Sequence, residues 1–440
     1  MNRFRMRIAV ALLLVCALPN ISLGYSVLTH EAIIDSMWAR DITPVLLKRF
    51  PGASADDLRQ AHAYAFGGAI IQDMGYYPFG SRFYSDLTHY ARSGEFVEAL
   101  LRDATDINEY AFAVGALSHY CADNDGHTIA TNVAVSVLYP KLRKQFGNTV
   151  TFEQKPSAHI QTEFGFDVLQ VAQGHYAPQA YHDFIGFKVA KPLLERAFRE
   201  TYGIELKSLF GDLDLALGTY RHTIGTLIPK LTRIAWQSTK HDMKSNSIAQ
   251  KPSVVRDSMA MDAPVTVGAG TRARFLFNLS RADYSKEWGD QYKKPGFFSK
   301  VFAGLLDLLP RIGPLKAFSF KASTPETEML FMRGFNATTA TFRAMLVRLG
   351  DNALVLDNRD LDTGKPTSTR EYGLADHAYV RLLRELAART FTDVNPQLRT
   401  NILAFFRDST MRPGTKRDST AWRQALVNLG RLKAATLPPG

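Results

Sequence analysis

Cysteine is scarce in this sequence. The 440 residues contain only two cysteines, Cys16 and Cys121. Cys16 lies in an apolar stretch near the N-terminus, so removal of a leader there would leave Cys121 alone. A single cysteine cannot form an intramolecular disulfide, even in an oxidising compartment. The fold must therefore be stabilised by its hydrophobic core and by any metal that it binds through other residue types.

Long apolar runs are also missing. The run Ile8–Leu18 has 11 residues, too few to span a bilayer comfortably, and no later run reaches the length of a transmembrane helix. Three arginines precede this run, and small residues follow it at positions 22 and 24. We therefore predict that residues 1–24 are a signal peptide, cut near Gly24–Tyr25, and that the protein is secreted or periplasmic. An uncleaved membrane anchor is the alternative.

Charge does not define a partner. The formal net charge is +11, and it falls to +8 without the three arginines of the predicted leader. A mild positive charge suits anionic surfaces or phosphate-bearing substrates. The sequence lacks a basic run interleaved with aromatic residues, the pattern of proteins that follow a single nucleic-acid strand.

Strict alternation of polar and apolar residues is rare, whereas apolar residues recur three and four positions apart. This helical pattern is clearest in residues 28–38, 57–73 and 106–123. Turn signals separate the runs, among them the tetrapeptide NDGH that ends at His127. We predict a mainly α domain over residues 25–242.

The character of the sequence changes after residue 242. Residues 243–296 are turn-rich and are predicted to form a linker or an irregular insertion. The following stretch, Phe297–Phe318, is apolar with basic residues and two prolines, so it would lie on a membrane surface or form a buried helix pair. Helical patterns then return, and residues 297–440 are predicted to be a mostly helical C-terminal region of unknown role.

Histidine and acidic residues recur at helical spacing. His119 and Asp123 are four positions apart, as are His159 and Glu163, so on a helix each pair would present an imidazole and a carboxylate on one face. Zinc binds both groups. Such a pair taken alone is more often an ordinary structural pair, because the pattern occurs by chance in many helices.

Other residues of these types lie in the same window. Asp73 ends a helical run, His89 lies in the next predicted element, His127 follows the NDG turn signal, and His30 is close to the predicted mature N-terminus. Five histidines and three acids thus occur in order, and this ordered set favours a metal site over a chance pair.

In this order the residues resemble the zinc-dependent phospholipase C family, which shares its fold with zinc-dependent single-strand nucleases. The family signature is an N-terminal residue, usually Trp, then a nearby His, an Asp, a His, H-x3-D, another His and H-x3-[ED]. The resemblance covers residues 25–163. It implies a phospholipase C/nuclease-like helical domain with a trinuclear zinc site, to which the helical C-terminal region is an extension.

The resemblance also implies nine metal ligands. One zinc ion would be held by Asp73, His89, His119 and Asp123. A second would be held by His127, His159 and Glu163. The third would be held by the amino nitrogen and carbonyl oxygen of Tyr25, by His30 and by a shared Asp123. Leader cleavage would free the Tyr25 amine and so complete the site.

The implied activity is that of a secreted phosphodiesterase, a phospholipase C that hydrolyses phospholipids by attack of zinc-bound hydroxide on phosphorus. Asp73 would also act as a catalytic proton acceptor. We expect three Zn²⁺ ions as cofactors and a phospholipid or membrane-surface substrate, and we infer no protein partner. A nuclease of single-stranded nucleic acid and a non-catalytic, zinc-stabilised envelope protein are the alternatives.

The sequence departs from the family at several positions. Three residues separate Asp123 from His127, where the best-known members have five. The positions that cage choline in the bacterial phospholipase are here Leu28, Met74 and Asp86, so choline specificity is not supported. Four nearby aromatic residues would either rebuild an aromatic wall or anchor a loop: Tyr76, Tyr77, Phe79 and Phe83.

Two residues inside the window are not assigned to metal. Cys121 lies between predicted ligands, but a thiolate would compete with them, so a small buried residue is expected. His62 lies on an apolar helical stretch and is expected in the core or at the surface.

Overall fold

The structure is a computed structural model, and it describes residues 27–172, 187–228, 232, 320–407 and 416–435. The predicted leader, Tyr25, the predicted insertion and the apolar stretch Phe297–Phe318 lie outside the described residues. The described part is helical and contains no β-strand, with one isolated bridge between Arg359 and Pro366. The predicted mainly α fold is confirmed. No helix in the described ranges is long and apolar enough to cross a membrane.

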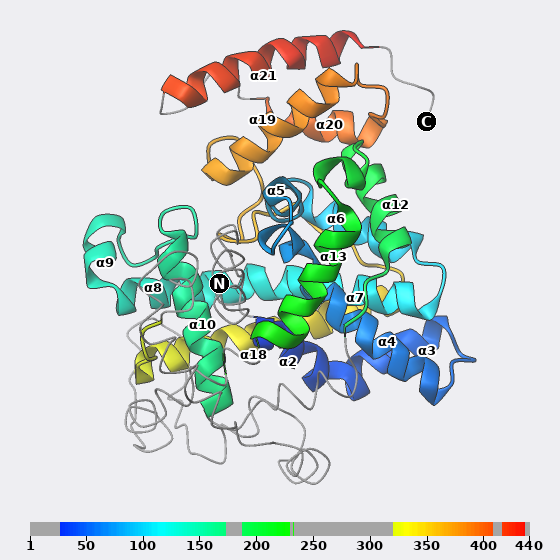
Figure 1. The fold of residues 1–440 in the computed structure, drawn as a ribbon, viewed down its shortest axis with the longest axis vertical. Coiled ribbons are helices and arrows are strands. Elements are labelled where there is room, and N and C mark those ends of the chain that lie inside the picture. The colour runs from blue at the N-terminus through cyan, green and yellow to red at the C-terminus, as the bar shows by residue number, and fades with distance from the viewer. Residues whose placement is uncertain (1–26, 173–186, 229–231, 233–319, 408–415, 436–440) are drawn as a thin grey trace, which may run out of the picture.

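The first half of the chain forms a compact set of helices and helical turns (Figure 1). In chain order these are α2 (Val27–Met37), η1 (Trp38–Ile42), α3 (Thr43–Arg49), α4 (Ala55–Gly68), η2 (Ile71–Tyr76), α5 (Arg82–Tyr90), α6 (Ser93–Asp103), α7 (Ile107–Gly126), η3 (His127–Thr131), α8 (Asn132–Leu138), α9 (Pro140–Phe146) and α10 (Pro156–Ala172).

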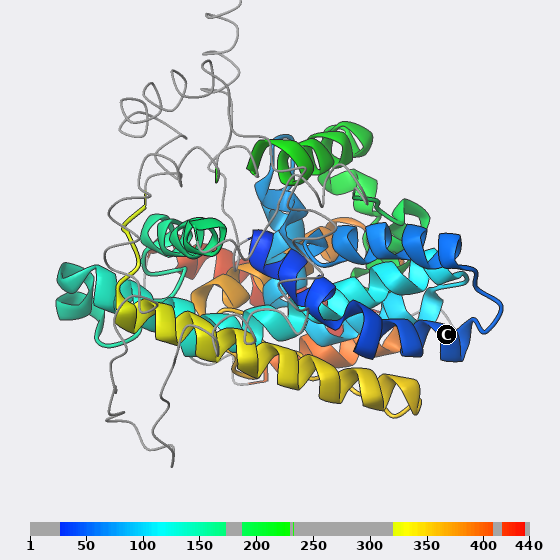
Figure 2. The same ribbon diagram turned by 90° about the horizontal axis from the view of Figure 1, so that it is seen from below.

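The remaining described elements are α12 (Lys191–Tyr202), η4 (Leu206–Leu209), α13 (Leu213–His222), η5 (Thr223–Leu227), α18 (Pro325–Gly350), α19 (Gly373–Ala388), α20 (Pro396–Phe405) and α21 (Lys416–Ala434). The long helix α18 passes across the bundle, and α19, α20 and α21 gather at one end of it (Figures 1 and 2).

Helix α7 is the central element, and its residues from Tyr110 to Asp123 are all buried. Two glycines allow α4 to cross it closely. A Cβ atom on Gly68 would lie 1.9 Å from the carbonyl oxygen of Phe112, and one on Gly115 would lie 2.2 Å from that of Ala65. Only glycine fits such a backbone contact. The crossing places η2, which follows α4, against the middle of α7.

The turn predicted at NDGH is wrong. Helix α7 continues through Gly126 and passes directly into η3 and α8. Asparagine often ends a helix, but Asn124 is accommodated within α7 because its side-chain amide donates to the carbonyl oxygen of Tyr120 at 2.8 Å. The consequence is that His127 lies one helical turn beyond Asp123, on the same face.

The C-terminal helices share one hydrophobic core with the N-terminal ones. Phe331 of α18 packs on Phe166 of α10 with ring centroids 4.9 Å apart, and the guanidinium of Arg381 in α19 lies 4.0 Å from the ring centre of Phe83 in α5. The domain boundaries drawn from the sequence stay a prediction, but the described C-terminal residues are packed against the predicted metal-binding domain.

Candidate metal centre

Helix α7 and its extension η3 present a row of potential metal ligands. His119, Asp123 and His127 follow one another at intervals of four residues, and all three are buried. This spacing places them on one face of the helix. The π-helical turn η3 begins at His127, and such turns are frequent at functional sites.

Helix α10 presents a second row with the same spacing: His159, Glu163 and Asp167. The carboxylate of Asp167 accepts hydrogen bonds from the backbone N–H of Leu28 at 3.2 Å and from the hydroxyl of Thr29 at 3.3 Å. It therefore accepts a hydrogen bond from a backbone N–H in the first turn of α2, which has no acceptor within the helix. Sequence reasoning missed Asp167, although its place four residues after Glu163 was a usable signal.

Asp73 is held by the short turn η2, which is fastened to α5 and α7. The Ser85 hydroxyl donates to the carbonyl oxygen of Gln72 at 2.6 Å and accepts from the N–H of Gly75 at 3.0 Å. The Gln72 side chain donates to the carbonyl oxygen of Ala116 at 2.9 Å. These bonds fix the backbone on both sides of Asp73.

Two imidazoles are oriented by backbone carbonyl groups. Nδ1 of His89 lies 2.8 Å from the Ser85 oxygen, and Nδ1 of His119 lies 2.9 Å from the Ala69 oxygen. Each contact assigns the ring proton to Nδ1 and directs Nε2 inward. The two Nε2 atoms lie 3.3 Å apart, and that of His89 is 3.2 Å from Asp73 Oδ1.

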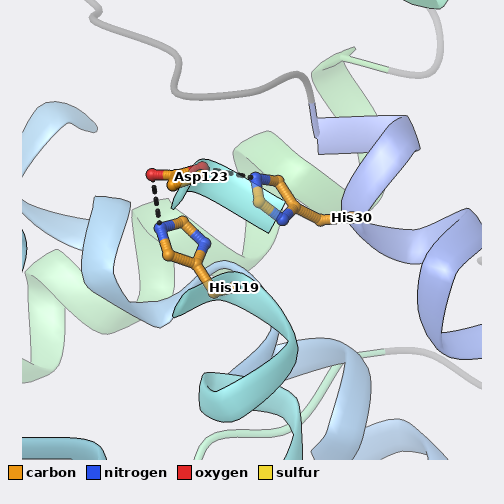
Figure 3. A group of neighbouring side chains, drawn as sticks. All are labelled: His30, His119 and Asp123. Carbon is orange, nitrogen blue, oxygen red and sulfur yellow. Dashed lines mark ion pairs between the residues drawn. The ribbon is translucent and has the colours of Figure 1, made fainter. Parts of the chain in front are cut away.

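Asp123 lies at the centre of the cluster. Its Oδ2 is 3.2 Å from His119 Nε2 and 3.3 Å from His89 Nε2. Its Oδ1 is 3.5 Å from His30 Nε2 and 3.8 Å from His127 Nε2. Figure 3 shows His30 reaching Asp123 from α2, beside His119 of α7. One carboxylate thus faces four imidazoles, which is the arrangement expected of a bridging ligand.

Three groups of side chains in the described residues have ligand atoms within 4.8 Å of one another. They are His30 with His119 and Asp123; Asp73 with His89 and His119; and His127 with His159 and Glu163. In the third group, Oε1 of Glu163 lies 2.9 Å from His159 Nε2 and 3.2 Å from His127 Nε2. The structure thus brings together eight of the nine residues expected from the sequence, whereas Tyr25 lies outside the described residues.

Burial and neighbouring charges shift the pKa values of the clustered side chains in opposite directions. Burial acts to raise the pKa of Asp123, but the neighbouring His119 and His127 hold that pKa well below its usual range. Burial acts to lower the pKa of His89, but Asp123 and Asp73 raise it to about 10. Burial raises the pKa of Glu163 to about 8. A bound cation would displace the imidazole protons, because metal ligands must be deprotonated.

The buried donor atoms fit a divalent cation. Both oxygens of Asp123 and of Glu163, and both ring nitrogens of His159, make no hydrogen bond within the described part of the chain. Burying such groups without hydrogen bonds is costly. Imidazole nitrogen and carboxylate oxygen are zinc ligands, so zinc would satisfy these atoms.

The predictions for Cys121 and His62 are confirmed. Cys121 is buried, its Sγ lies 3.3 Å from Sδ of Met345 in α18, and burial raises the thiol pKa well above its usual value. His62 is a core residue whose ring stacks on Trp38 with centroids 3.9 Å apart and on Phe66 at 4.6 Å.

The four aromatic residues near the choline-cage positions differ in their burial and in their distance from the candidate ligands. Tyr77 and Phe83 are buried in the core, as loop anchors would be, and Phe79 is exposed. Tyr76 alone of the four has its ring against a candidate ligand: its centroid lies 5.9 Å from that of His89 and 6.3 Å from that of Phe152.

One further carboxylate reaches the cluster from the C-terminal region. Oδ1 of Asp362 lies 3.5 Å from Nδ1 of His127. Sequence reasoning missed this residue, because Asp362 has no histidine at helical spacing and lies 235 positions after His127.

Comparison with known proteins bears on the first half of the chain. A family model described as zinc dependent phospholipase C matches residues 29–212. The matched range includes the eight clustered residues and excludes α18 to α21 and Asp362. No curated protein and no solved structure matches the chain.

Proposed function

We propose that this protein is a phospholipase C that hydrolyses the phosphodiester bond of phospholipids, since a family model described as zinc dependent phospholipase C matches residues 29–212. The observation that carries the proposal is the position of Asp123, whose two oxygens face four imidazoles, one each from α2, α5, α7 and η3. A carboxylate with this many neighbouring imidazoles could bind more than one cation at adjacent positions, as phosphoryl transfer assisted by more than one metal requires.

We further propose the full ligand set. The pairing of His89 with Asp73 and of His119 with Asp123 supports one zinc ion, and the contacts of Glu163 with His127 and His159 support a second. His30 and Asp123 would share a third ion with the freed amine and the carbonyl oxygen of Tyr25. The link between Asp167 and the first turn of α2 supports this placement, because it fixes the chain close to Tyr25.

When bound, zinc would supply a water with a pKa near ~7 and would neutralise charge on the phosphoryl oxygens. The residues of the chain provide position and proton transfer. The carboxylate of Asp73 accepts the proton of the attacking water, at the edge of the cluster beside His89. The ring orientations of His89 and His119 are set before substrate arrives, since backbone carbonyl groups hold their Nδ1 atoms.

The proposed location is outside the cytoplasm. The basic, apolar leader in residues 1–24 supports export and cleavage near Gly24–Tyr25. Cleavage at this point both exports the protein and frees the amine proposed as a ligand.

The test is to express the chain with its own leader, sequence its N-terminus and count zinc per chain. The purified protein is then offered mixed phospholipid vesicles, a phosphocholine ester and single-stranded DNA. We expect three zinc ions and release of diacylglycerol with a phosphorylated headgroup. Turnover of DNA alone would replace the lipid substrate with nucleic acid. Zinc without turnover, or fewer than two zinc ions, would contradict both enzyme functions.

A second test addresses Tyr25 separately. One extra residue placed before Tyr25 in the mature protein moves the α-amine away from its proposed ion. We expect one zinc ion fewer and a steep loss of activity, whereas Tyr25→Phe, which keeps the backbone, serves as the control. An unchanged zinc count in the extended protein would exclude the amine as a ligand.

A further inference from the structure

Asp362 lies in the segment between α18 and α19, outside the range that matches the family. We propose that Asp362 is a positioning residue of the metal centre, which fixes the ring of His127 so that its Nε2 faces Glu163. The inference rests on the proposed metal centre, and it gives the C-terminal region a role in that centre.

The two ring nitrogens of His127 face two different carboxylates. Nε2 lies 3.2 Å from Glu163 Oε1, among the candidate ligands, and Nδ1 lies 3.5 Å from Asp362 Oδ1. A histidine that binds a metal through one nitrogen usually carries its proton on the other and donates it to a carboxylate or a backbone carbonyl group. For His89 and His119 that acceptor is a backbone carbonyl. For His127 the carboxylate of Asp362 is on the corresponding side of the ring, at an ion-pair distance of 3.5 Å rather than in a hydrogen bond.

The carboxylate of Asp362 is itself held rigidly. The side chain is only 1% exposed. Its Oδ2 accepts from the backbone N–H of Phe152 at 2.9 Å and from the hydroxyl of Tyr372 at 2.5 Å. Both donors are on Oδ2, so Oδ1 is the oxygen directed toward His127. A buried carboxylate with a fixed second oxygen is suited to hold an imidazole in one orientation.

The backbone around Asp362 is fastened to several helices of the metal-binding half. The carbonyl oxygen of Asp362 accepts from the Asn132 side chain at 2.8 Å, and the N–H of Leu361 donates to the carbonyl oxygen of His89 at 3.1 Å. The Tyr120 hydroxyl donates to the carbonyl oxygen of Asp357 at 2.8 Å. These bonds reach α5, α7 and α8, so the segment has a defined position over the cluster.

Zinc affinity tests the inference independently of phospholipase activity. In the full-length mature protein, Asp362→Asn keeps the shape of the side chain and removes its charge. An amide can accept on one side only, so either His127 or the Phe152–Tyr372 pair loses its acceptor. We expect the affinity for one zinc ion, measured by competition with a chromophoric chelator, to fall by about 10- to 100-fold.

Tyr372→Phe is the matched control, because it removes a hydrogen bond to Oδ2 and leaves Oδ1 facing His127. We expect its zinc affinity to stay close to that of the wild type. A His127→Ala variant identifies the ion concerned: the double variant His127→Ala/Asp362→Asn should hold no fewer zinc ions than His127→Ala alone. Equal losses in Asp362→Asn and Tyr372→Phe would mean that Asp362 acts only as a structural residue.

A measurement on the wild-type protein covers the case in which Asp362→Asn does not fold. With selectively ¹⁵N-labelled histidine, the zinc-loaded chain should show His127 protonated at Nδ1 and metal-bound at Nε2. Metal at Nδ1, or unchanged zinc affinity in a folded Asp362→Asn variant, would overturn the inference while leaving the proposed function in place. A wild-type chain that binds no zinc would overturn both.

Discussion

Replacement of Asp123 by Asn is the sharpest test of the cluster as a metal centre. The change keeps the size of a fully buried side chain and removes the charge that faces four imidazoles. Asn can offer only one oxygen, so it cannot serve two groups at once. The affinity for zinc should therefore fall both in the group of His30 with His119 and Asp123 and in the group of Asp73 with His89 and His119. The group of His127 with His159 and Glu163 should retain its ion.

The magnitude follows from the number of contacts. Removal of a residue that merely orients a ligand costs about 10- to 100-fold in metal affinity. A lost bridging ligand should cost at least about 100-fold for each ion, which corresponds to roughly 3 kcal/mol per ion. At a free zinc concentration that just saturates the wild type, Asp123→Asn should hold about one ion instead of three.

The assay is metal content after equilibration with zinc buffers, followed by calorimetric titration of the metal-free protein. Asp125→Asn is the control, because Asp125 is in the same turn of α7 but has its carboxyl beside Thr341 rather than in the cluster. Circular dichroism of the metal-free variants checks that both are folded. A folded Asp123→Asn protein with the zinc content of the wild type would refute the assignment of Asp123 as a ligand.

Three further predictions concern the surroundings of the cluster. Cys121→Ala should leave the zinc content unchanged and reduce the free energy of unfolding by about 1 kcal/mol, because it leaves a small cavity; a lost zinc ion would make the thiol a ligand. Burial lowers the pKa of His62 to about 3, below the value of about 6.5 in an unfolded chain, so stability is lost as pH falls from about 6.5 toward 3. In metal-free protein, the free energy of unfolding of the wild type should therefore fall between pH 7 and pH 5, and His62→Phe should make this fall smaller by about 2 kcal/mol, measured by urea unfolding. An unchanged fall would contradict a histidine that is neutral and buried in the folded protein. Asp167→Asn should lower the free energy of unfolding by about 1 kcal/mol through the start of α2, and it should weaken only the zinc ion near His30; equal weakening of all ions would contradict a local effect.

The helical class and the clustered residues could be predicted from the sequence because both depend on short-range spacing. His119 with Asp123 and His159 with Glu163 are pairs within one helix, and their four-residue interval already places each on one face. The order of the other residues linked them to a family, and the crossing of α4 and α7 then brings Asp73 beside His119.

Long-range packing determines the features that the sequence does not predict. Asn, Asp and Gly favour turns locally, so the sequence predicts a turn at NDGH, but buried packing keeps the chain helical from α7 into η3. Asp362 was missed because its contact with His127 joins distant parts of the chain, and no periodic pattern encodes such a contact. The position of α18 against α7 likewise depends on long-range packing, such as that between Cys121 and Met345.

The row on α7 restricts how the length of this protein can change. One continuous helical segment, α7 and the first residue of η3, supplies His119, Asp123 and His127, and these residues contribute to all three groups. A single residue inserted between His119 and Asp123 would rotate everything beyond it by about 100° and turn the carboxylate away from the imidazoles. Insertions and deletions in the connections between helices leave these angles unchanged. We therefore expect related chains to vary in length in their loops, while the four-residue interval from His119 to Asp123 stays constant.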